Sequence, residues 1–433
     1  MPILRRISPP WVIGLVFALL SVRLFSYVAE HSVNLLFWDH WDFYEAYFNN
    51  TGLVDLFRWQ HGPHRQGLGG LVMKAIDSLS GWDTRVESFA CTGFFVFSAG
   101  LALWLKRRLS GRWHYTDALI ALIFLRISIW EALFGTVNLA HGAIPLMLVL
   151  IFALALSYPA SVGRQMVLVV VDGLATFTGF GICLGLIGPV IFSAQFWYAR
   201  KDPRSGWLLA GSVVASLLFL GLFFTNYRSI PSAECFVFPD PKPWRYVLFL
   251  GGQMASAIGV YNHRAIPIVI GLIVASFLVR LFTRTIQNKA FVLTFLLAYA
   301  AAFSVNLAIG RACIGVGAAL TSRYIPFLMP AILALYCYGV MHAEGHLKTR
   351  LLWGLLVMLV VNDFVTTPIF FRRVPGMMAK RAEWAECYRQ KENIDACSKE
   401  TGVDVYPAPP VTHLNEKLQF LKEHRLNLFH SKS

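Results

Sequence analysis

The sequence predicts an all-α fold, a polytopic transmembrane helical bundle of about 11–12 spans. Of its 433 residues, 56% are hydrophobic and only 14% are charged, whereas a soluble domain carries about 25% charged residues. Its mean hydropathy is +0.56. Apolar runs of about 17–25 residues, long enough to cross a bilayer as helices, recur along the chain.

These runs define the expected spans. They are 11–30, 86–105, 115–135, 140–157, 166–182, 184–199, 206–225, 264–282, 290–309, 324–341 and 351–371. The run at 11–22 resembles a signal peptide, but it lacks a small-x-small cleavage site and continues through Arg23, so we expect a retained anchor. The segment 245–261 is rich in Gly, Ala and Ser, and it either spans or re-enters.

Basic clusters fall at alternate ends of the expected helices. They are Arg5–Arg6, Lys106–Arg107–Arg108, Arg164, Arg200–Lys201–Arg204, Arg280–Arg284 and Lys348–Arg350. The positive-inside rule makes their side cytoplasmic and places 31–85, 226–244 and 310–323 outside. The polar tail, 372–433, follows a transmembrane domain, 1–371. It lies outside if 245–261 re-enters. If that segment spans, either another expected helix is wrong or the tail is cytoplasmic.

The first outer loop, 31–85, is too aromatic for a linker. Its spacing predicts helices lying at the membrane interface, where Trp and Tyr are favoured. The residues that carry the pattern are Phe43, Tyr44, Tyr47, Phe48, Leu53, Leu56, Phe57 and Trp59. This loop forms either an amphipathic belt or a substrate platform beside the bilayer, and the two interpretations are compatible.

Charge and cysteine usage argue against a nucleic-acid-binding protein and against a cysteine-based metal site. The net charge is +14, but we find no basic face with aromatic stacking positions, so we expect no nucleic-acid partner. The seven cysteines lack metal-type spacing. Cys387 and Cys397 would form a disulfide if the tail faces an oxidising compartment.

The segment Trp38-Asp39-His40-Trp41-Asp42 places two carboxylates just after the first expected span. Three residues apart, Asp39 and Asp42 share one face of a helix, where they can divide general-base and cation-binding work. The alternative for Asp39 is a helix cap. His40 is a ligand or simply solvated.

Two further clusters carry polar groups. His61 and His64 flank a Gly-Pro turn before Arg65, whose guanidinium suits a lipid phosphate. The histidine spacing suggests a metal site, for a possible divalent cation, but no set of further ligands is evident.

A third cluster contains Trp130-Glu131, with Asn138 and His141. It places an ionisable residue, Glu131, in an expected span, where it is either functional or paired with an arginine such as Arg126.

The fourth cluster runs from Gly310-Arg311 through Gly315 and Gly317 to Ser322-Arg323-Tyr324. Flexible backbone and two arginines suit a phosphate or pyrophosphate. Positive charge on the outer side opposes the topology rule, which favours a functional explanation.

Together these clusters resemble the GT-C superfamily of glycosyltransferases that use lipid-linked sugars. The resemblance is carried by Asp39-His40-Trp41, His61-x-x-His64-Arg65, Trp130-Glu131 and Arg311…Ser322-Arg323-Tyr324. They look like Asp-Asp-Trp, His-Asn-Glu-His-Arg, Trp-Glu-Asn and Arg…Ser-Arg-Tyr of an uncharacterised bacterial group. Here His40 replaces the second Asp, Gly62-Pro63 replaces Asn-Glu, and Ala132 replaces Asn.

The resemblance implies a GT-C-like bundle in a bacterial inner membrane with its site on the periplasmic face. It implies transfer, with inversion, of a sugar from a polyprenyl-phosphate carrier to a glycan or lipid-linked acceptor. Asp39 is the expected base and Asp42 the fallback. Arg311, Arg323, Tyr324, Arg65 and His64 are expected at the donor phosphate, with Glu131, His61 and His40 at the acceptor or behind these groups.

Two rival functions remain: an O-antigen-type polymerase or ligase, and a transporter of lipid or solute. A polymerase usually carries its site in a large late outer loop, and a transporter is expected to show paired broken helices. The sugar, the acceptor, the need for a metal and the oligomeric state stay open.

Overall fold

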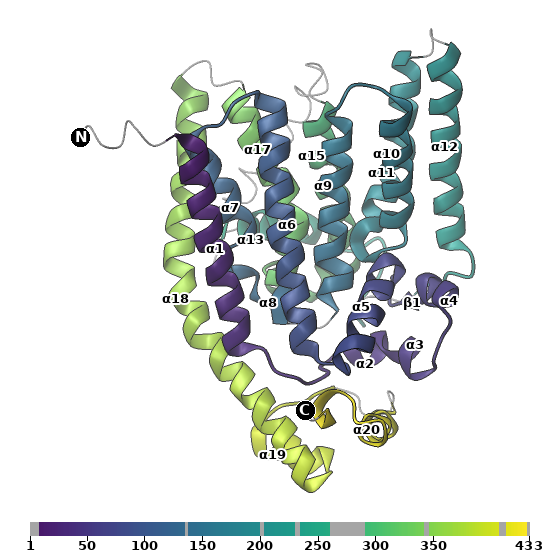
Figure 1. The fold of residues 1–433 in the computed structure, drawn as a ribbon, viewed down its shortest axis with the longest axis vertical. Helices are drawn as coiled ribbons and strands as arrows, with labels where there is room; N and C mark the ends of the chain where they lie inside the picture. Colours follow the sequence, from purple (N-terminus) through teal and green to yellow (C-terminus); the bar gives the residue numbers. More distant parts are fainter. Residues whose placement is uncertain are drawn as a thin grey trace, which may run out of the picture.

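The computed structural model describes residues 8–134, 137–199, 203–229, 234–259, 291–341, 346–406 and 413–430, and it is a helical bundle (Figure 1). Seven segments within them are long and apolar enough to cross a membrane: Pro9–His31, Thr84–Ser110, Leu139–Leu156, Gly179–Trp197, Gly206–Phe224, Phe291–Ile314 and Ser322–Met341. The corresponding helices are α1 (Pro9–His31), α6 (Thr84–Ser110), α9 (Ile144–Leu156), α11 (Ile182–Ala199), α12 (Pro203–Phe224), α15 (Phe291–Arg311) and α17 (Ile325–Met341). The all-α, polytopic prediction is confirmed.

The ends of these helices follow ordinary chain chemistry. Helix α1 opens on two prolines, whose fixed φ suits a first helical turn. Asp83 caps α6 by accepting a hydrogen bond from the backbone N–H of Arg85 at 3.0 Å. Gly111 ends α6 at a φ of +73°, a conformation that glycine adopts without strain.

The expected span 115–135 is not one helix. It is divided into the 3₁₀ turns η2 (Tyr115–Asp117) and η3 (Ile127–Ile129) and the short helices α7 (Ala118–Phe124) and α8 (Trp130–Phe134). The break falls at Arg126, whose backbone is extended. The single-helix prediction is therefore wrong, and the break frees α8 to turn toward a later part of the chain.

Two other expected spans, and the segment 245–261 that was expected either to span or to re-enter, form helices of unusual length. Helix α10 (Val162–Thr176) has 15 residues and α13 (Trp244–Ala257) has 14, or roughly 21 Å, which is short for a bilayer core of about 30 Å. The expected span 351–371 lies inside α18 (His346–Lys391), a helix of 46 residues. The expected span 264–282 lies outside the described residues.

Two charged groups inside the bundle, Arg23 and Lys106, are paired with carboxylates. Arg23 of α1 contacts Asp363 of α18 at 3.0 Å and donates to the carbonyl of Leu125. Lys106 contacts Asp117 at 2.6 Å, and Tyr336 donates to the same carboxylate. Pairing of this kind offsets the cost of holding charge away from water.

The first loop forms one end of the bundle (Figure 1). It contains α2 (His40–Phe43), α3 (Glu45–Phe48), α4 (Leu53–Arg58), a hairpin of β1 (Gln60–His61) and β2 (His64–Arg65), and α5 (Gly67–Ser80). The expected short helices are present, but most of their aromatic residues do not form a belt on the membrane surface. Phe43, Tyr44 and Tyr47 are buried inside the protein, because they pack on one another and on Trp82.

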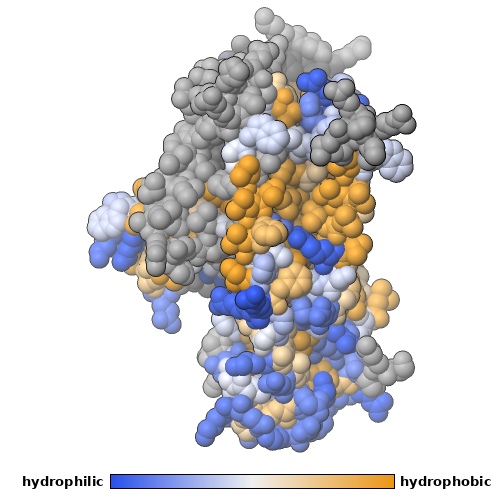
Figure 2. All heavy atoms as spheres, turned by 90° about the vertical axis from the view of Figure 1, so that its left-hand side faces the viewer, coloured by the Kyte–Doolittle hydropathy of each residue, from blue (hydrophilic) through white to orange (hydrophobic). Residues whose placement is uncertain are grey.

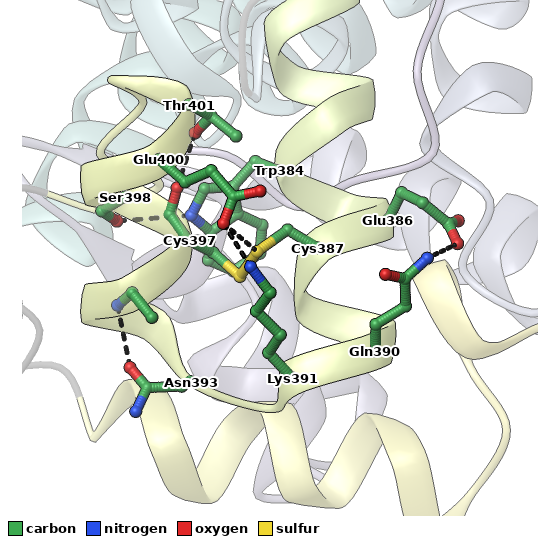
Figure 3. Close-up of a disulfide and its surroundings, with 11 residues drawn as sticks. Trp384, Glu386, Cys387, Gln390, Lys391, Asn393, Cys397, Ser398, Glu400 and Thr401 are labelled. Atoms are coloured by element: carbon green, nitrogen blue, oxygen red, sulfur yellow. Dashed lines mark hydrogen bonds and ion pairs between the residues drawn. A yellow bond between two sulfur atoms is a disulfide. The ribbon is translucent and has the colours of Figure 1, made fainter.

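The C-terminal tail lies at the same end as the first loop (Figure 1). Helix α18 passes through the expected boundary at 371/372 without a break and is followed by α19 (Ile394–Thr401), α20 (Leu414–Glu423) and the turn η8 (Asn427–Phe429). A disulfide between Cys387 and Cys397, the pairing foreseen from the sequence, joins α18 to α19 (Figure 3). An ion pair between Lys391 and Glu400 lies beside it.

Asn427 fixes the tail on the first loop. Its side chain donates to the side-chain oxygen of Asn34 and to the carbonyl of Trp82, both at 2.8 Å, and accepts from the backbone N–H of Leu36. It is fully buried. The tail and the loop 31–85 are therefore on one side of the membrane, whichever side that is.

The distribution of side chains agrees with insertion in a bilayer. On the face in Figure 2, hydrophobic side chains gather over the middle of the bundle, and hydrophilic ones cover the end formed by the tail. At the end of the bundle away from the tail, helices α1, α6 and α11 each carry an exposed tryptophan: Trp11, Trp104 and Trp197. Such rings are favoured at membrane–water interfaces.

Replacing Asn427 by Ala should lower the free energy of unfolding by about 2–4 kcal/mol, because three hydrogen bonds made by its buried side chain are lost. Thermal unfolding in detergent, with limited proteolysis to detect release of the tail, measures this effect. Asn49→Ala, at an exposed position, is the control. Equal melting temperatures for both variants would contradict this account of docking.

Candidate functional site

The turn that carries Asp39 has an uncommon backbone. Trp38, just before it, has a φ of +51°, a left-handed conformation that costs energy in a non-glycine residue. Asp39 occupies the N-cap position of α2, but its side chain makes no capping hydrogen bond. The capping alternative is therefore wrong, and among the described residues this half-buried carboxylate accepts no hydrogen bond.

The two other polar residues of this turn have partners within the protein. Asp42 accepts a hydrogen bond from the phenol of Tyr406, a tail residue. The His40 side chain is buried, with Nε2 at 3.3 Å from a carboxylate oxygen of Glu87. These contacts give His40 a structural role and leave Asp39 as the available carboxylate.

The hairpin brings the two sequence-predicted histidines together. His61 and His64 are opposite each other across β1 and β2, and Gly62 takes the positive φ of +55° that the turn requires. Arg65 is committed elsewhere, because its guanidinium donates to the backbone carbonyls of Phe223, Thr225 and Arg58. It fixes the hairpin to the end of α12.

A third histidine completes this cluster. His141 belongs to a π-helix, η4 (Leu139–Ala143), a rare form often found at functional sites. Its ring centroid lies 5.2 Å from those of both His61 and His64. One ring nitrogen of each residue is buried without a hydrogen-bond partner in the described part of the chain.

Burial keeps the hairpin histidines neutral. Loss of water lowers the pKa of His61, although the negative charges of Asp39 and Asp42 oppose this shift. Burial also lowers the pKa of His64 to about 3, and the positive charge of Arg311 adds to the effect. Among the described residues, no three His, Cys, Asp or Glu side chains are arranged to hold a metal ion.

Glu131 binds a segment far along the chain. Its carboxylate accepts hydrogen bonds from the hydroxyl of Ser322 at 2.7 Å and from the backbone N–H of Arg323 at 3.2 Å. These residues form the turn η7 (Ser322–Tyr324), which opens α17. Glu131 thus holds the Ser-Arg-Tyr sequence in place rather than standing free.

Two arginines flank one aromatic ring at this point. The guanidinium carbons of Arg311 and Arg323 lie 5.8 Å and 5.4 Å from the ring centroid of Tyr324. Arg311 ends α15, and Arg323 interacts electrostatically with Asp39 and Glu131. Within the described part of the chain, neither guanidinium forms an ion pair.

A second disulfide braces the arginine segment. Cys235 bonds to Cys313, which lies in η6 (Ala312–Ile314) two residues after Arg311. The chain then passes through α16 (Val316–Ala319) to η7. The sequence analysis did not predict this pairing. The signal was present, because both cysteines lie in loops expected on the same outer side.

The structure therefore gathers a subset of the expected residues. The residues brought together are Asp39, His61, His64, Glu131, Arg311, Arg323 and Tyr324, joined by the unforeseen His141 contact. Asp42, His40 and Arg65 hold neighbouring segments. Within the described part of the chain, the cluster combines a carboxylate without a hydrogen-bond partner, neutral imidazoles and two cations, a set suited to proton transfer beside a bound anion.

Comparisons of this chain with known protein families, curated proteins and solved structures found no match. The fold and its apolar helices define the class: an integral membrane protein built as an all-α polytopic bundle. Any finer assignment depends on the chemistry of the cluster itself.

The depressed pKa of His64 predicts pH-dependent stability. The unfolded chain takes up a proton below about pH 6.5 but the folded chain does so only near pH 3, so acidification between these values favours unfolding. The slope is at most about 1.4 kcal/mol per pH unit for one histidine. His64→Gln should flatten the fall in stability measured in detergent from pH 7.5 to 4.5. Parallel curves for wild type and variant would contradict the shift.

Proposed function

We propose that the protein is a membrane glycosyltransferase that moves a sugar from a polyprenyl-phosphate donor to a glycan or lipid-linked acceptor. One observation carries the proposal: Arg311 and Arg323 both contact Tyr324 at the ends of two apolar helices, near the carboxylate of Asp39, which accepts no hydrogen bond from the described residues. A lipid phosphate has its charge at the interface and its tail in the bilayer. Arginines at the ends of membrane helices suit such a molecule.

We place this end of the bundle on the outer face, the periplasmic side of a bacterial inner membrane. Two disulfides lie there, and such bonds persist in oxidising compartments. The basic residues Arg107 and Arg108 lie at the opposite end of α6, as the positive-inside rule expects of a cytoplasmic end.

The reaction is a single displacement. A hydroxyl of the acceptor attacks the anomeric carbon of the sugar while its proton passes to the carboxylate of Asp39. The bond from that carbon to the phosphate oxygen breaks, and polyprenyl phosphate leaves with the bonding electron pair. Attack and departure on opposite faces invert the configuration at this carbon.

The two arginines stabilise the leaving group. As the bond breaks, negative charge grows on the phosphate, and Arg311 and Arg323 stabilise it more strongly than in the ground state. Neutral His61 and His64 add no competing positive charge at physiological pH. Glu131 acts by fixing Arg323, through the backbone contact already described.

Asp39→Asn should lower the transfer rate about 10²–10⁴-fold, the range expected for loss of a general base. Arg323→Ala should lower it through loss of charge stabilisation. Mass spectrometry of surface glycans from a deletion strain, complemented at matched membrane levels, measures the restored sugar. Asp55→Asn, exposed in the same loop, and Arg108→Ala, at the opposite end of α6, are the controls.

Each result has a distinct meaning. Restoration by wild type and controls but not by the two site variants supports the transferase. Full restoration by Asp39→Asn would overturn the assignment of the base. Accumulation of single repeat units in the deletion strain would indicate a polymerase, and an unchanged set of glycans would direct attention to transport.

The orientation predicts the accessibility of thiols. In a Cys235→Ser/Cys313→Ser variant, a membrane-impermeant maleimide should label Cys387 and Cys397 on intact cells only after reduction, because breaking their disulfide frees α19 and exposes the two buried sulfurs. The other three cysteines have no disulfide to reduce and lie within the apolar helices α6, α11 and α17, so they serve as an internal control. Labelling that requires permeabilised cells would place the tail, and with it the first loop, in the cytoplasm.

A further inference from the structure

The tail segment before residue 407 docks on the turn that presents Asp39. The backbone N–H of Trp38 donates to the carbonyl of Val405 at 2.8 Å, and its indole N–H donates to the carbonyl of Asp404 at 3.2 Å. Val405 is buried. Since Trp38 has a left-handed backbone, these bonds help to offset the strain of the conformation that sets the direction of Asp39.

Tyr406 extends this contact to the second carboxylate. Its phenol donates a hydrogen bond to Asp42 and interacts electrostatically with Asp39. Burial is the main cause that raises the pKa of Tyr406, and the two carboxylates add to it. The phenol therefore keeps its proton at physiological pH and remains a donor.

The rest of the tail gives this segment a rigid base. Lys417 of α20 is buried and contacts the carboxylate of Glu45 at 2.8 Å and the carbonyl of Trp41 at 2.9 Å. Arg381 of α18 stacks on Phe37, with its guanidinium carbon 3.7 Å from the ring centroid. The turn from 37 to 45 is thus held by the tail on several sides, and Tyr406 lies at the carboxylates.

We propose that Tyr406 is a positioning residue for the sugar transfer: by holding the carboxylate of Asp42 it fixes the turn from which Asp39 takes the proton of the acceptor. This role rests on the proposed function, because it concerns the same site. It makes the C-terminal tail a part of the active site, although Tyr406 lies 364 residues after Asp42 in the chain. Tyr406 itself need not touch the substrate.

The test compares two tyrosines of the tail. Tyr406→Phe removes one hydroxyl and its hydrogen bond, whereas Tyr388→Phe removes a hydroxyl from a ring that stacks on Trp384, away from the carboxylates. With the purified full-length chain and a polyprenyl-phosphate sugar, Tyr406→Phe should lower kcat about 10–100-fold, with the KM for the donor unchanged. Tyr388→Phe should retain wild-type kcat.

A double-mutant cycle with Asp42→Asn separates positioning from a general structural effect. If Tyr406 acts through Asp42, the double variant transfers sugar no more slowly than Asp42→Asn alone. Independent, multiplying losses would overturn the proposal, as would a wild-type kcat in Tyr406→Phe. A lowered melting temperature in Tyr406→Phe, with kcat per folded protein unchanged, would also overturn it.

The two proposals fail in different ways. Absence of sugar transfer by the wild-type chain with every polyprenyl-phosphate sugar would overturn the proposed function and the role of Tyr406 with it. Transfer by the wild type, lost in Asp39→Asn but retained in Tyr406→Phe, would overturn only the role of Tyr406.

Discussion

The hydrogen bonds accepted by Glu131 are the contact on which the arrangement of the site depends. They join α8, a helix of five residues, to the turn that opens α17, more than 190 residues later. The backbone N–H that binds Glu131 belongs to Arg323, so the carboxylate fixes this residue directly. Tyr324 follows in the same turn, and its ring centroid lies 5.8 Å from the guanidinium carbon of Arg311 and 5.4 Å from that of Arg323. A carboxylate at the start of a helix is also favoured by the partial positive charge there.

Burial then determines which of the neighbouring side chains can carry a charge. The hairpin histidines lie in a buried cluster that favours the neutral imidazole, while Asp39 is half-buried and free of hydrogen bonds from described residues. His40, only one residue from Asp39, instead pairs with Glu87. The two adjacent residues thus have different roles, because the His40 side chain is buried in the packed loop and the Asp39 side chain is only half-buried.

The sequence was sufficient for the fold class and for seven spans, since hydropathy alone identifies long apolar helices. It was insufficient where tertiary contacts override composition. The break at Arg126 and the burial of Phe43 and Tyr44 depend on what packs against them. Order and spacing made Asp39, the histidines and the arginines candidate site residues, but could not predict that Arg65 is bound to backbone carbonyls. The contact of Tyr406 with Asp42 had no local signal, because no periodicity relates residues so far apart.

Four cations of the bundle show a contrast that bears on function. Arg23 and Lys106 each have a carboxylate within 3.0 Å, which balances their charge locally. Arg311 and Arg323 both contact an aromatic ring, and Arg323 interacts with the more distant carboxylates of Asp39 and Glu131, but neither arginine forms an ion pair in the described structure. A charge near the hydrocarbon region is costly unless it is balanced, so a cation kept without a close partner favours an anion from outside the chain. A lipid-linked phosphate would provide that anion at the depth where these two helices end.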